Sequence, residues 1–269
     1  MKLFYVYGSG FGHLNRIISY IHNKKYIYSE CVILTNSRHT SFLPKEIVIV
    51  HRVDSFFKNH TKFQIEFSHL IEANQINELI VDVFPCGFYG ELHILQAIKI
   101  KKTLLSRILN QSYFNQYRSP CFDELVVFED GIELYNYQFG KQTKMTFNLK
   151  TRYITREIKL KKPFFYIIHS EPDEEVIQLY KFAKLYQKNN EHIYIQTLNK
   201  INGLEHIDNI TLIPTKKPLL SLLKESQKIF TACGFNIMIE TSKFREKQYL
   251  FPFKRRYDDQ FKRKAILEI

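Results

Sequence analysis

The chain of 269 residues has no tryptophan, only three methionines and no long apolar run. No window of about 18 uncharged apolar residues occurs, which excludes a membrane-spanning helix of ordinary length. The chain starts with a strand-like segment instead of a charged and apolar leader. We therefore expect neither secretion nor membrane insertion.

Cysteine is also scarce, and Cys31, Cys86, Cys121 and Cys233 form no CxxC pair. They lie in apolar or turn contexts, so we expect reduced, buried thiols and a cytoplasmic location. Apolar residues make up 45% of the chain and charged residues 25%, which is ordinary for a globular protein and excludes disorder. The length suffices for two domains.

Positive charge is in excess, with 39 Lys/Arg against 27 Asp/Glu and a net charge of +12. Residues 141–162 carry eight basic side chains and one acid, and residues 243–264 carry nine and three. Such surfaces attract the phosphates of a nucleotide, a nucleic acid or an anionic membrane. Solvated faces of a lysine-rich protein explain the same charge equally well.

Short β-branched or aromatic runs alternate with amphipathic segments through both halves of the chain. Near-continuous apolar strands separated by helices are typical of parallel sheets covered on both faces. We predict an α/β protein with two domains, residues 1–155 and 156–269, divided in a basic, weakly periodic connection. The expected strands are Leu3–Tyr7, Cys31–Thr35, Ile47–Val53, Leu79–Phe84, Leu125–Phe128, Phe164–Ile168, His192–Gln196, Ile210–Ile213, Lys228–Thr231 and Tyr249–Phe251.

The stretch YGSGFGHLNR, residues 7–16, follows an expected strand and precedes a helix expected to begin near His13. Backbone N–H groups at such a turn suit an anion or an attacking hydroxyl. The stretch is no dinucleotide fingerprint, because His13 replaces the last glycine, and it lacks the Lys-Ser/Thr pair of a P-loop. Taken alone, a histidine at position 13 is more often a structural or capping residue than a catalytic one.

Two further turns follow strands in the same way. DVFPCGFYGEL, beginning at Asp82, lies where ligands of parallel sheets bind, and its Glu91 either contacts substrate or complements a helix dipole. FTACGFNIMIE, residues 230–240, places a small-residue turn before a helix, and Glu240 lies well over one helical turn beyond Gly234. A carboxylate there is able to accept hydrogen bonds from two ribose hydroxyls.

Four motifs in register resemble one family: GFGHxxR, DxFPxGxxxEL, GxNxMxE and FPxxRRxxDQxxR. They are similar to motifs of nucleotide-sugar-dependent glycosyltransferases of the GT-B fold, a group that includes the N-acetylglucosaminyltransferase of the peptidoglycan lipid precursor. The match covers roughly residues 3–16, 79–92 and 226–266. The resemblance implies two Rossmann-like domains facing across a cleft, with the acceptor on the first domain and the donor on the second.

For the acceptor side, the resemblance implies that His13 is the general base or an electrostatic aid. The other acceptor-side residues are Gly10, Gly12, Arg16, Asp82 and Glu91. For the donor side it implies contacts to the diphosphate, the ribose and the sugar hydroxyls, with cations that neutralise the leaving diphosphate. These residues are, in that order, Gly234, Phe235 and Asn236 for the diphosphate, Glu240 for the ribose, Asp259 and Gln260 for the sugar, and Arg255 or Arg256 as the cation.

The resemblance also implies an inverting transfer without metal or cofactor, in which a nucleotide-sugar, most simply a UDP-sugar, is the co-substrate. The acceptor is then a carbohydrate, a lipid-linked glycan at the inner membrane face, or a small metabolite. One departure concerns residues 167–175, IIHSEPDEE, where the family has a glycine-rich turn and this chain has four acids. These acids either oppose a diphosphate or cap the following helix.

Two other functions remain open at this point. A protein of the same fold with a DNA or RNA base as acceptor would use the basic segments to follow the nucleic-acid backbone. A non-catalytic binding protein would have lost donor affinity through the changed 167–175 loop. The sequence identifies neither the sugar nor the acceptor.

Overall fold

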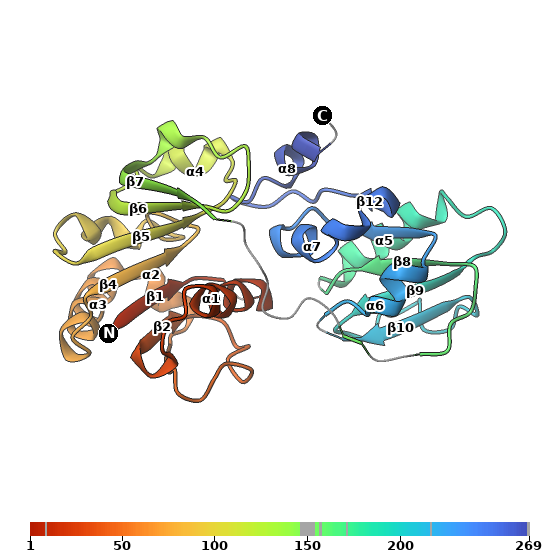
Figure 1. Cartoon of the computed structure of the whole chain (residues 1–269), viewed down its shortest axis with the longest axis horizontal. Helices are drawn as coiled ribbons and strands as arrows, with labels where there is room; N and C mark the ends of the chain where they lie inside the picture. Colours follow the sequence, from red (N-terminus) through yellow and green to blue (C-terminus); the bar gives the residue numbers. More distant parts are fainter. Residues whose placement is uncertain (9, 146–153, 156–157, 171, 216, 268–269) are drawn as a thin grey trace. The chain divides into compact units, whose positions relative to one another are not determined.

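The computed structural model of the full chain describes residues 1–8, 10–145, 154–155, 158–170, 172–215 and 217–267. The chain divides into two compact units (Figure 1). The amino-terminal unit comprises Met1–Lys150 with Arg256–Asp259, and the carboxy-terminal unit comprises Thr151–Arg255 with Gln260–Ile269. No helix among the described residues has the length and apolar character needed to cross a membrane.

The amino-terminal unit is built on a seven-stranded parallel sheet in the order β3-β2-β1-β4-β5-β6-β7. β1 is an inner strand, in which Phe4 pairs with Ile33 on one side and Ile80 on the other. The strand order reverses between β1 and β4, and ligands of open parallel sheets bind beyond the carboxyl ends of strands at such a point. The strands are β1 Lys2–Val6, β2 Cys31–Thr35, β3 Val48–His51, β4 Glu78–Asp82, β5 Lys101–Ser106, β6 Cys121–Val127 and β7 Gln138–Lys144.

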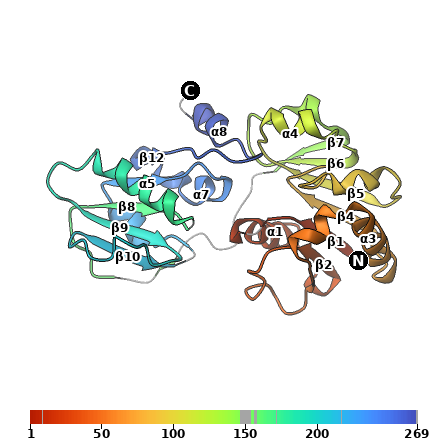
Figure 2. The same ribbon diagram turned by 180° about the vertical axis from the view of Figure 1, so that it is seen from behind.

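Helices cover both faces of this sheet (Figures 1 and 2). Leu3 and Tyr5 of β1 belong to one buried cluster with Phe63 and Phe67 of α3. The alternate residue Phe4 contacts Tyr26, just after α1, on the opposite face. The helical segments of this unit are α1 Phe11–Asn23, η1 Tyr28–Glu30, α2 Asp54–Lys58, α3 His60–Ala73, η2 Glu91–Gln96, α4 Gln111–Gln116 and η3 Leu134–Asn136, the η segments being 3₁₀ helices.

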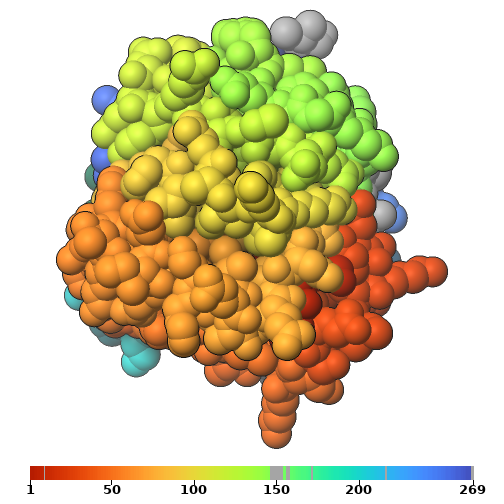
Figure 3. Space-filling model, turned by 90° about the vertical axis from the view of Figure 1, so that its left-hand side faces the viewer, coloured from red at the N-terminus to blue at the C-terminus, as the bar shows by residue number. Residues whose placement is uncertain are grey.

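The face of the amino-terminal unit in Figure 3 shows α3 in orange and the segments around β5 to β7 in yellow to green. β7 lies at the edge of the sheet and has no buried residue, since its sequence QFGKQTK is polar apart from Gly140 and the half-buried Phe139. Edge strands with lysines resist pairing with other chains.

The carboxy-terminal unit has a five-stranded parallel sheet in the order β10-β9-β8-β11-β12. Alternate residues of β8 pack on different helices: Phe165 and Ile167 on α5, Phe164 and Tyr166 on α6. The strand order reverses between β8 and β11, so the turns after these strands share one edge. The elements are β8 Phe164–Ile168, α5 Asp173–Lys184, β9 His192–Thr197, β10 Ile210–Pro214, α6 Leu220–Glu225, β11 Lys228–Thr231, α7 Phe235–Glu240, η4 Ser242–Lys247, β12 Gln248–Leu250 and α8 Gln260–Leu267.

The predicted α/β class is confirmed, and each expected strand is present within a few residues. The prediction missed β5 and β7, because β5 starts with two lysines and β7 has no apolar pattern. The expectation of buried thiols holds for Cys31, Cys86 and Cys233 but is wrong for Cys121, which is exposed at the start of β6.

The loop after β4 is tightly folded around Glu91, which is fully buried. Tyr5 Oη donates a hydrogen bond to the Glu91 carboxylate, as do the backbone N–H groups of Phe88 at 3.3 Å and Tyr89 at 2.8 Å. Gly87 has φ +79°, and a Cβ there would lie 2.3 Å from Glu91 Oε2. Glycine is required at this position for both reasons.

We expect Gly87→Ala to lower the free energy of unfolding by about 2–4 kcal/mol, because backbone strain adds to the clash with a buried carboxylate. Gly203→Ala is the matched control: Gly203 has φ +85°, but a Cβ there would meet no atom within 4 Å. Gly203→Ala should lower the free energy of unfolding by only about 1 kcal/mol. Urea unfolding of both variants measures the difference, and equal costs would contradict the packing described for Glu91.

Candidate functional site

Three polar side chains meet at the carboxyl ends of β1 and β4. The chain leaves β1 through Gly8, whose N–H donates to Asn36 Oδ1 at 2.7 Å, and α1 begins at Phe11. His13 and Arg16 are therefore three residues apart and share one face of α1. Asp82 is the last residue of β4, which pairs directly with β1.

Asp82 binds both partners. Its Oδ1 accepts a hydrogen bond from Arg16 Nε at 2.7 Å, and its Oδ2 accepts one from Arg16 Nη2 at 2.6 Å. Asp82 Oδ2 also lies 2.7 Å from His13 Nδ1. Asp82 and Arg16 are completely buried, whereas the His13 side chain is 23% exposed. The imidazole is the member of this group that meets solvent.

The protonation states follow from these contacts. Burial alone would favour neutral Asp82, but the Arg16 guanidinium and the His13 imidazole hold the pKa of Asp82 well below its usual range. Arg16 Nη2 lies 3.0 Å from His13 Nδ1 but donates over the shorter distance of 2.6 Å to Asp82 Oδ2. Since ionised Asp82 has no proton to donate, His13 Nδ1 carries the hydrogen in its 2.7 Å contact with Asp82 Oδ2. Burial lowers the pKa of His13, although Asp82 opposes the shift. Neutral His13 therefore carries its lone pair on Nε2.

The three glycines of the first turn differ in backbone conformation and in the space around them. A Cβ at Gly8 would lie 2.3 Å from His13 Cδ2, so a side chain there would displace the imidazole. Gly10 is the N-cap of α1 with extended φ −80° and ψ 163°, and Gly12 lies in the first turn of the helix. Gly8, which is not among the site residues expected from the sequence, thus leaves the space that the imidazole occupies.

Sequence reasoning also missed a neighbouring group of charges. Arg107, which follows β5, donates from Nη2 to Asp258 Oδ1 at 2.6 Å, and its Nε lies 3.9 Å from Glu129 Oε1. Arg107 contributes to the lowered pKa of His13, after burial and Arg16. Its position at the carboxyl end of a parallel strand would have identified it, had β5 been predicted.

The segment Arg256–Asp259 belongs to the amino-terminal unit. Asn110 Nδ2 donates to the carbonyl oxygen of Arg256 at 2.9 Å, and Asn110 N–H donates to that of Tyr257 at 2.7 Å. The backbone N–H of Asp259 donates to Ile108 O at 3.5 Å. Two residues expected on the donor side, Arg256 and Asp259, are thus attached to this unit.

In the carboxy-terminal unit, Glu240 ends α7 and is 8% exposed. Burial raises the pKa of its carboxyl group to about 8, although Lys217 acts in the opposite direction. No described residue donates a hydrogen bond to this carboxyl group. A buried acid with unused acceptor oxygens is costly to fold and is typical of ligand sites.

The turn before α7 is fixed from its other side by α8. Gln260 Oε1 accepts hydrogen bonds from the backbone N–H groups of Cys233 at 3.2 Å and Phe253 at 3.0 Å. Arg263 Nη1 donates to Cys233 O at 2.8 Å. Gly234 itself is unhindered, since a Cβ there would meet nothing nearer than Ile237 Cγ2 at 3.9 Å. The fold therefore does not require glycine at 234. Phe235 and Asn236 open the helix that follows.

One acid of residues 167–175, Glu175, is neutralised by its neighbours. Glu175 Oε2 lies 2.8 Å from His169 Nε2 and accepts from Arg255 Nη2 at 2.6 Å, while Oε1 accepts from Arg255 Nη1. Although burial opposes it, His169 and Arg255 lower the pKa of Glu175 to about 2. Asp173 Oδ1 accepts from Asn199 Nδ2 at 3.0 Å, and Glu171 lies outside the described residues. The first acids of α5 suit its positive end.

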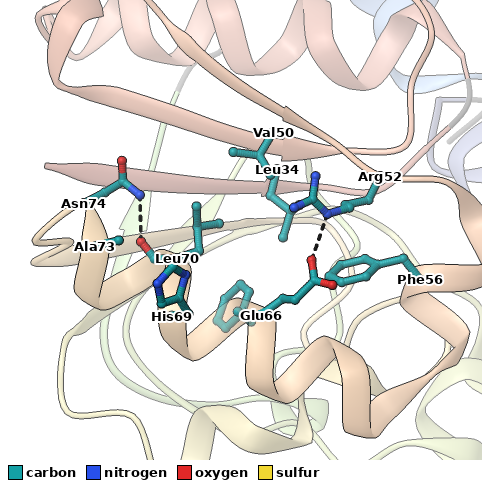
Figure 4. Close-up of a pocket in the computed structure, with 10 residues that line it drawn as sticks. Leu34, Val50, Arg52, Phe56, Glu66, His69, Leu70, Ala73 and Asn74 are labelled. Atoms are coloured by element: carbon teal, nitrogen blue, oxygen red, sulfur yellow. Dashed lines mark hydrogen bonds and ion pairs between the residues drawn. The ribbon is translucent and has the colours of Figure 1, made fainter.

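A separate cavity of about 190 Å³ lies in the amino-terminal unit between β2, β3 and α3 (Figure 4). Its lining is mostly apolar, with Leu34, Val50 and Leu70 against the Arg52–Glu66 ion pair. It contains none of the residues expected from the sequence. Among the described residues there is also no group of three His, Cys, Asp or Glu side chains arranged for a metal.

No protein-family model and no curated protein sequence matches the chain. Solved structures do match: the spinosyn rhamnosyltransferase SpnG complexed with thymidine diphosphate has a TM-score of 0.66 at 11% identity, over 100% of this chain and 84% of that one. The glycosyltransferase SnogD from Streptomyces nogalater has 0.65 at 10%, over 100% and 84%. The UDP-GlcNAc 2-epimerase from Methanocaldococcus jannaschii has 0.53 at 11%, over 100% and 92%.

The chain has the GT-B fold. At sequence identities this low, structural similarity establishes the fold but not the activity, which must be argued from the residues of the site. Both transferases and epimerases share this architecture with the chain.

We expect Asp82→Asn to destabilise the protein by about 3–5 kcal/mol, because it leaves the buried Arg16 guanidinium without its counter-charge. Asp130→Asn is the control, since the exposed Asp130–Lys144 pair should change stability by less than about 0.5 kcal/mol. Denaturant unfolding at neutral pH compares the two. Equal effects would mean that the Asp82 carboxylate does not hold the group together.

Proposed function

We propose that the protein is a glycosyltransferase that moves a sugar from a nucleoside diphosphate, most simply a UDP-sugar, to an acceptor hydroxyl. The observation that carries this proposal is Glu240, a buried carboxyl group with a pKa near 8 at the strand-order reversal of the carboxy-terminal sheet. It is supported by the GT-B fold and by neighbours whose structures contain thymidine diphosphate or UDP.

On the donor side, Glu240 accepts hydrogen bonds from the two ribose hydroxyls. These donors favour the ionised carboxylate, so binding lowers the pKa of Glu240 and releases a proton. The diphosphate lies against the backbone N–H groups of residues 234–236, where the missing side chain of Gly234 leaves room for close approach. A glycine that the fold does not need supports this assignment.

The other residues expected on the donor side bind the sugar or shape the diphosphate-binding turn. We assign the sugar hydroxyls to Asp259 and to the amide nitrogen of Gln260, because the Gln260 oxygen already accepts two backbone N–H groups. Phe235 and Asn236 extend the diphosphate-binding turn. Since Arg255 is engaged by Glu175, it fixes the 167–175 loop and leaves charge neutralisation to the backbone N–H groups.

On the acceptor side, His13 Nε2 is the general base. The acceptor oxygen forms a bond to the anomeric carbon as the bond from that carbon to the diphosphate oxygen breaks, and the acceptor proton moves to His13. Ionised Asp82 orients the ring and stabilises the imidazolium that forms. This single displacement inverts the anomeric centre, and we propose that it needs no metal. Gly10 and Gly12 give the acceptor access to His13.

The acceptor classes expected from the sequence stay within this proposal: a carbohydrate, a lipid-linked glycan or a metabolite. The nucleic-acid alternative draws less support, because three cations of residues 243–264 are bonded inside the carboxy-terminal unit. They are Arg245 to Met238 O, Arg255 to Glu175 and Arg263 to Cys233 O. Of the eight basic residues in 141–162, Lys144 and Lys162 pair with Asp130 and Glu225, and Lys150, Arg152 and Arg156 lie outside the described residues.

Glu240→Gln should weaken UDP binding at least tenfold, because it replaces an acceptor pair with one acceptor and one donor. Binding of UDP to the natural chain at pH 7 should release most of one proton, measured by calorimetry in buffers of different ionisation enthalpy.

The free protein should also lose stability as pH rises from about 4.5 to 8, since folded Glu240 holds a proton that the unfolded chain releases.

Gly234→Ala provides the companion variant for this experiment. It should leave thermal stability unchanged, weaken UDP binding and preserve the proton release of whatever binding remains, because Glu240 is intact. Proton release that persists in Glu240→Gln would assign the titrating group elsewhere and contradict the ribose contact.

His13→Ala should reduce sugar transfer by about 10²–10⁴-fold while UDP binding is retained, because only the proton acceptor is lost. His22→Ala, an exposed histidine on the same helix, is the control and should behave like the natural chain. Product formation is measured over a panel of UDP-sugars and acceptors. Epimerisation of the donor sugar without any acceptor would favour the epimerase activity of other GT-B proteins instead.

A further inference from the structure

An aromatic surface extends from His13 within the amino-terminal unit. The His13 ring stacks on Phe84 with centroids 6.2 Å apart, and Phe84 meets Phe88 edge to face at 5.2 Å. Phe88 in turn contacts Tyr89 at 5.1 Å and Tyr257 at 5.1 Å. Phe88 and Tyr89 are half-buried, so this surface reaches solvent at the end remote from the imidazole.

Arg256 lies on this remote end. Its guanidinium carbon is 4.8 Å from the ring centre of Tyr257, 5.1 Å from that of Phe88 and 5.8 Å from that of Tyr89. Ring faces hold a guanidinium flat without using its N–H donors. Hydrogen bonds from Asn110 to the backbone oxygens of residues 256 and 257 fix the segment that carries it.

The N–H donors of Arg256 have no acceptor among the described residues. Its neighbour in sequence, Arg255, is by contrast bound twice by Glu175. Asp54, which bonds the hydroxyl of Tyr89 on this surface, is engaged by Lys58 Nζ at 2.6 Å and by the hydroxyl of Tyr7. Arg256 is thus a positioned cation whose planar fork matches an oxyanion.

We propose that Arg256 binds a phosphoryl or carboxylate group of the acceptor, which makes the acceptor an anionic molecule. This inference rests on the proposed transfer reaction and reassigns Arg256 from the donor diphosphate to the acceptor. The hydroxyl that attacks lies at His13, the body of the acceptor lies along Phe88, and its anionic group pairs with Arg256.

The test uses phenyl phosphate as the probe, with phenol as the uncharged counterpart, titrated into the full chain in the presence and absence of UDP and followed by NMR. Arg256→Gln should raise the Kd for phenyl phosphate at least fivefold and leave the Kd values for phenol and UDP unchanged. Arg118→Gln, an exposed arginine of the same unit without a described ring contact, should change none of the three.

Three results would overturn the proposal: an unchanged Kd for phenyl phosphate in Arg256→Gln, an equal loss in Arg118→Gln, or a loss confined to UDP. The last would return Arg256 to the donor diphosphate. Absence of UDP binding in every variant, with phenyl phosphate binding that still depends on Arg256, would contradict the transferase and support the anion site.

Discussion

The ionised carboxylate of Asp82 is the interaction on which the amino-terminal site depends. It lies at the end of β4 and is buried, and it stays charged because Arg16 binds both of its oxygens and His13 contacts one of them. The same charge fixes the His13 tautomer and leaves Nε2 with the lone pair. Gly8 lets the imidazole lie against the backbone. A base of this kind requires that α1 and β4 meet at neighbouring strand ends, which the parallel order β1-β4 provides.

The carboxy-terminal unit uses its carboxyl groups differently. Glu175 is stabilised as a carboxylate by His169 and Arg255, and the Arg255 guanidinium offsets the negative charge of this one acid of the loop. No described residue donates a hydrogen bond to Glu240, and burial raises the pKa of its carboxyl group to about 8. Unsatisfied groups of this type are retained where a ligand supplies the missing donors. One unit therefore holds an oriented imidazole, and the other holds a buried carboxyl group to which no described residue donates a hydrogen bond.

Much of this arrangement was predictable from the sequence. The apolar runs predicted ten of the twelve strands found among the described residues, and the rule that ligands bind at carboxyl ends of parallel strands led to the turns that carry His13 and Asp82. The role expected of Glu240 came from its place along the following helix and from the family resemblance. Other contacts join residues far apart in the chain and leave no local pattern. The Arg107–Asp258 pair spans 151 positions, and the aromatic support of Arg256 needs loops whose folding no spacing rule predicts. Glu91 illustrates the same limit, because Tyr5 and two backbone N–H groups determine where its carboxylate lies.

The central claim is that Glu240 receives the ribose of a nucleoside diphosphate. A crystal structure of the full chain with UDP tests this most directly. The account predicts both Glu240 carboxylate oxygens at hydrogen-bonding distance, about 2.6–3.2 Å, from the O2′ and O3′ hydroxyls, with the diphosphate against the backbone N–H groups of residues 234–236. A nucleotide bound with its ribose away from Glu240 would contradict the account.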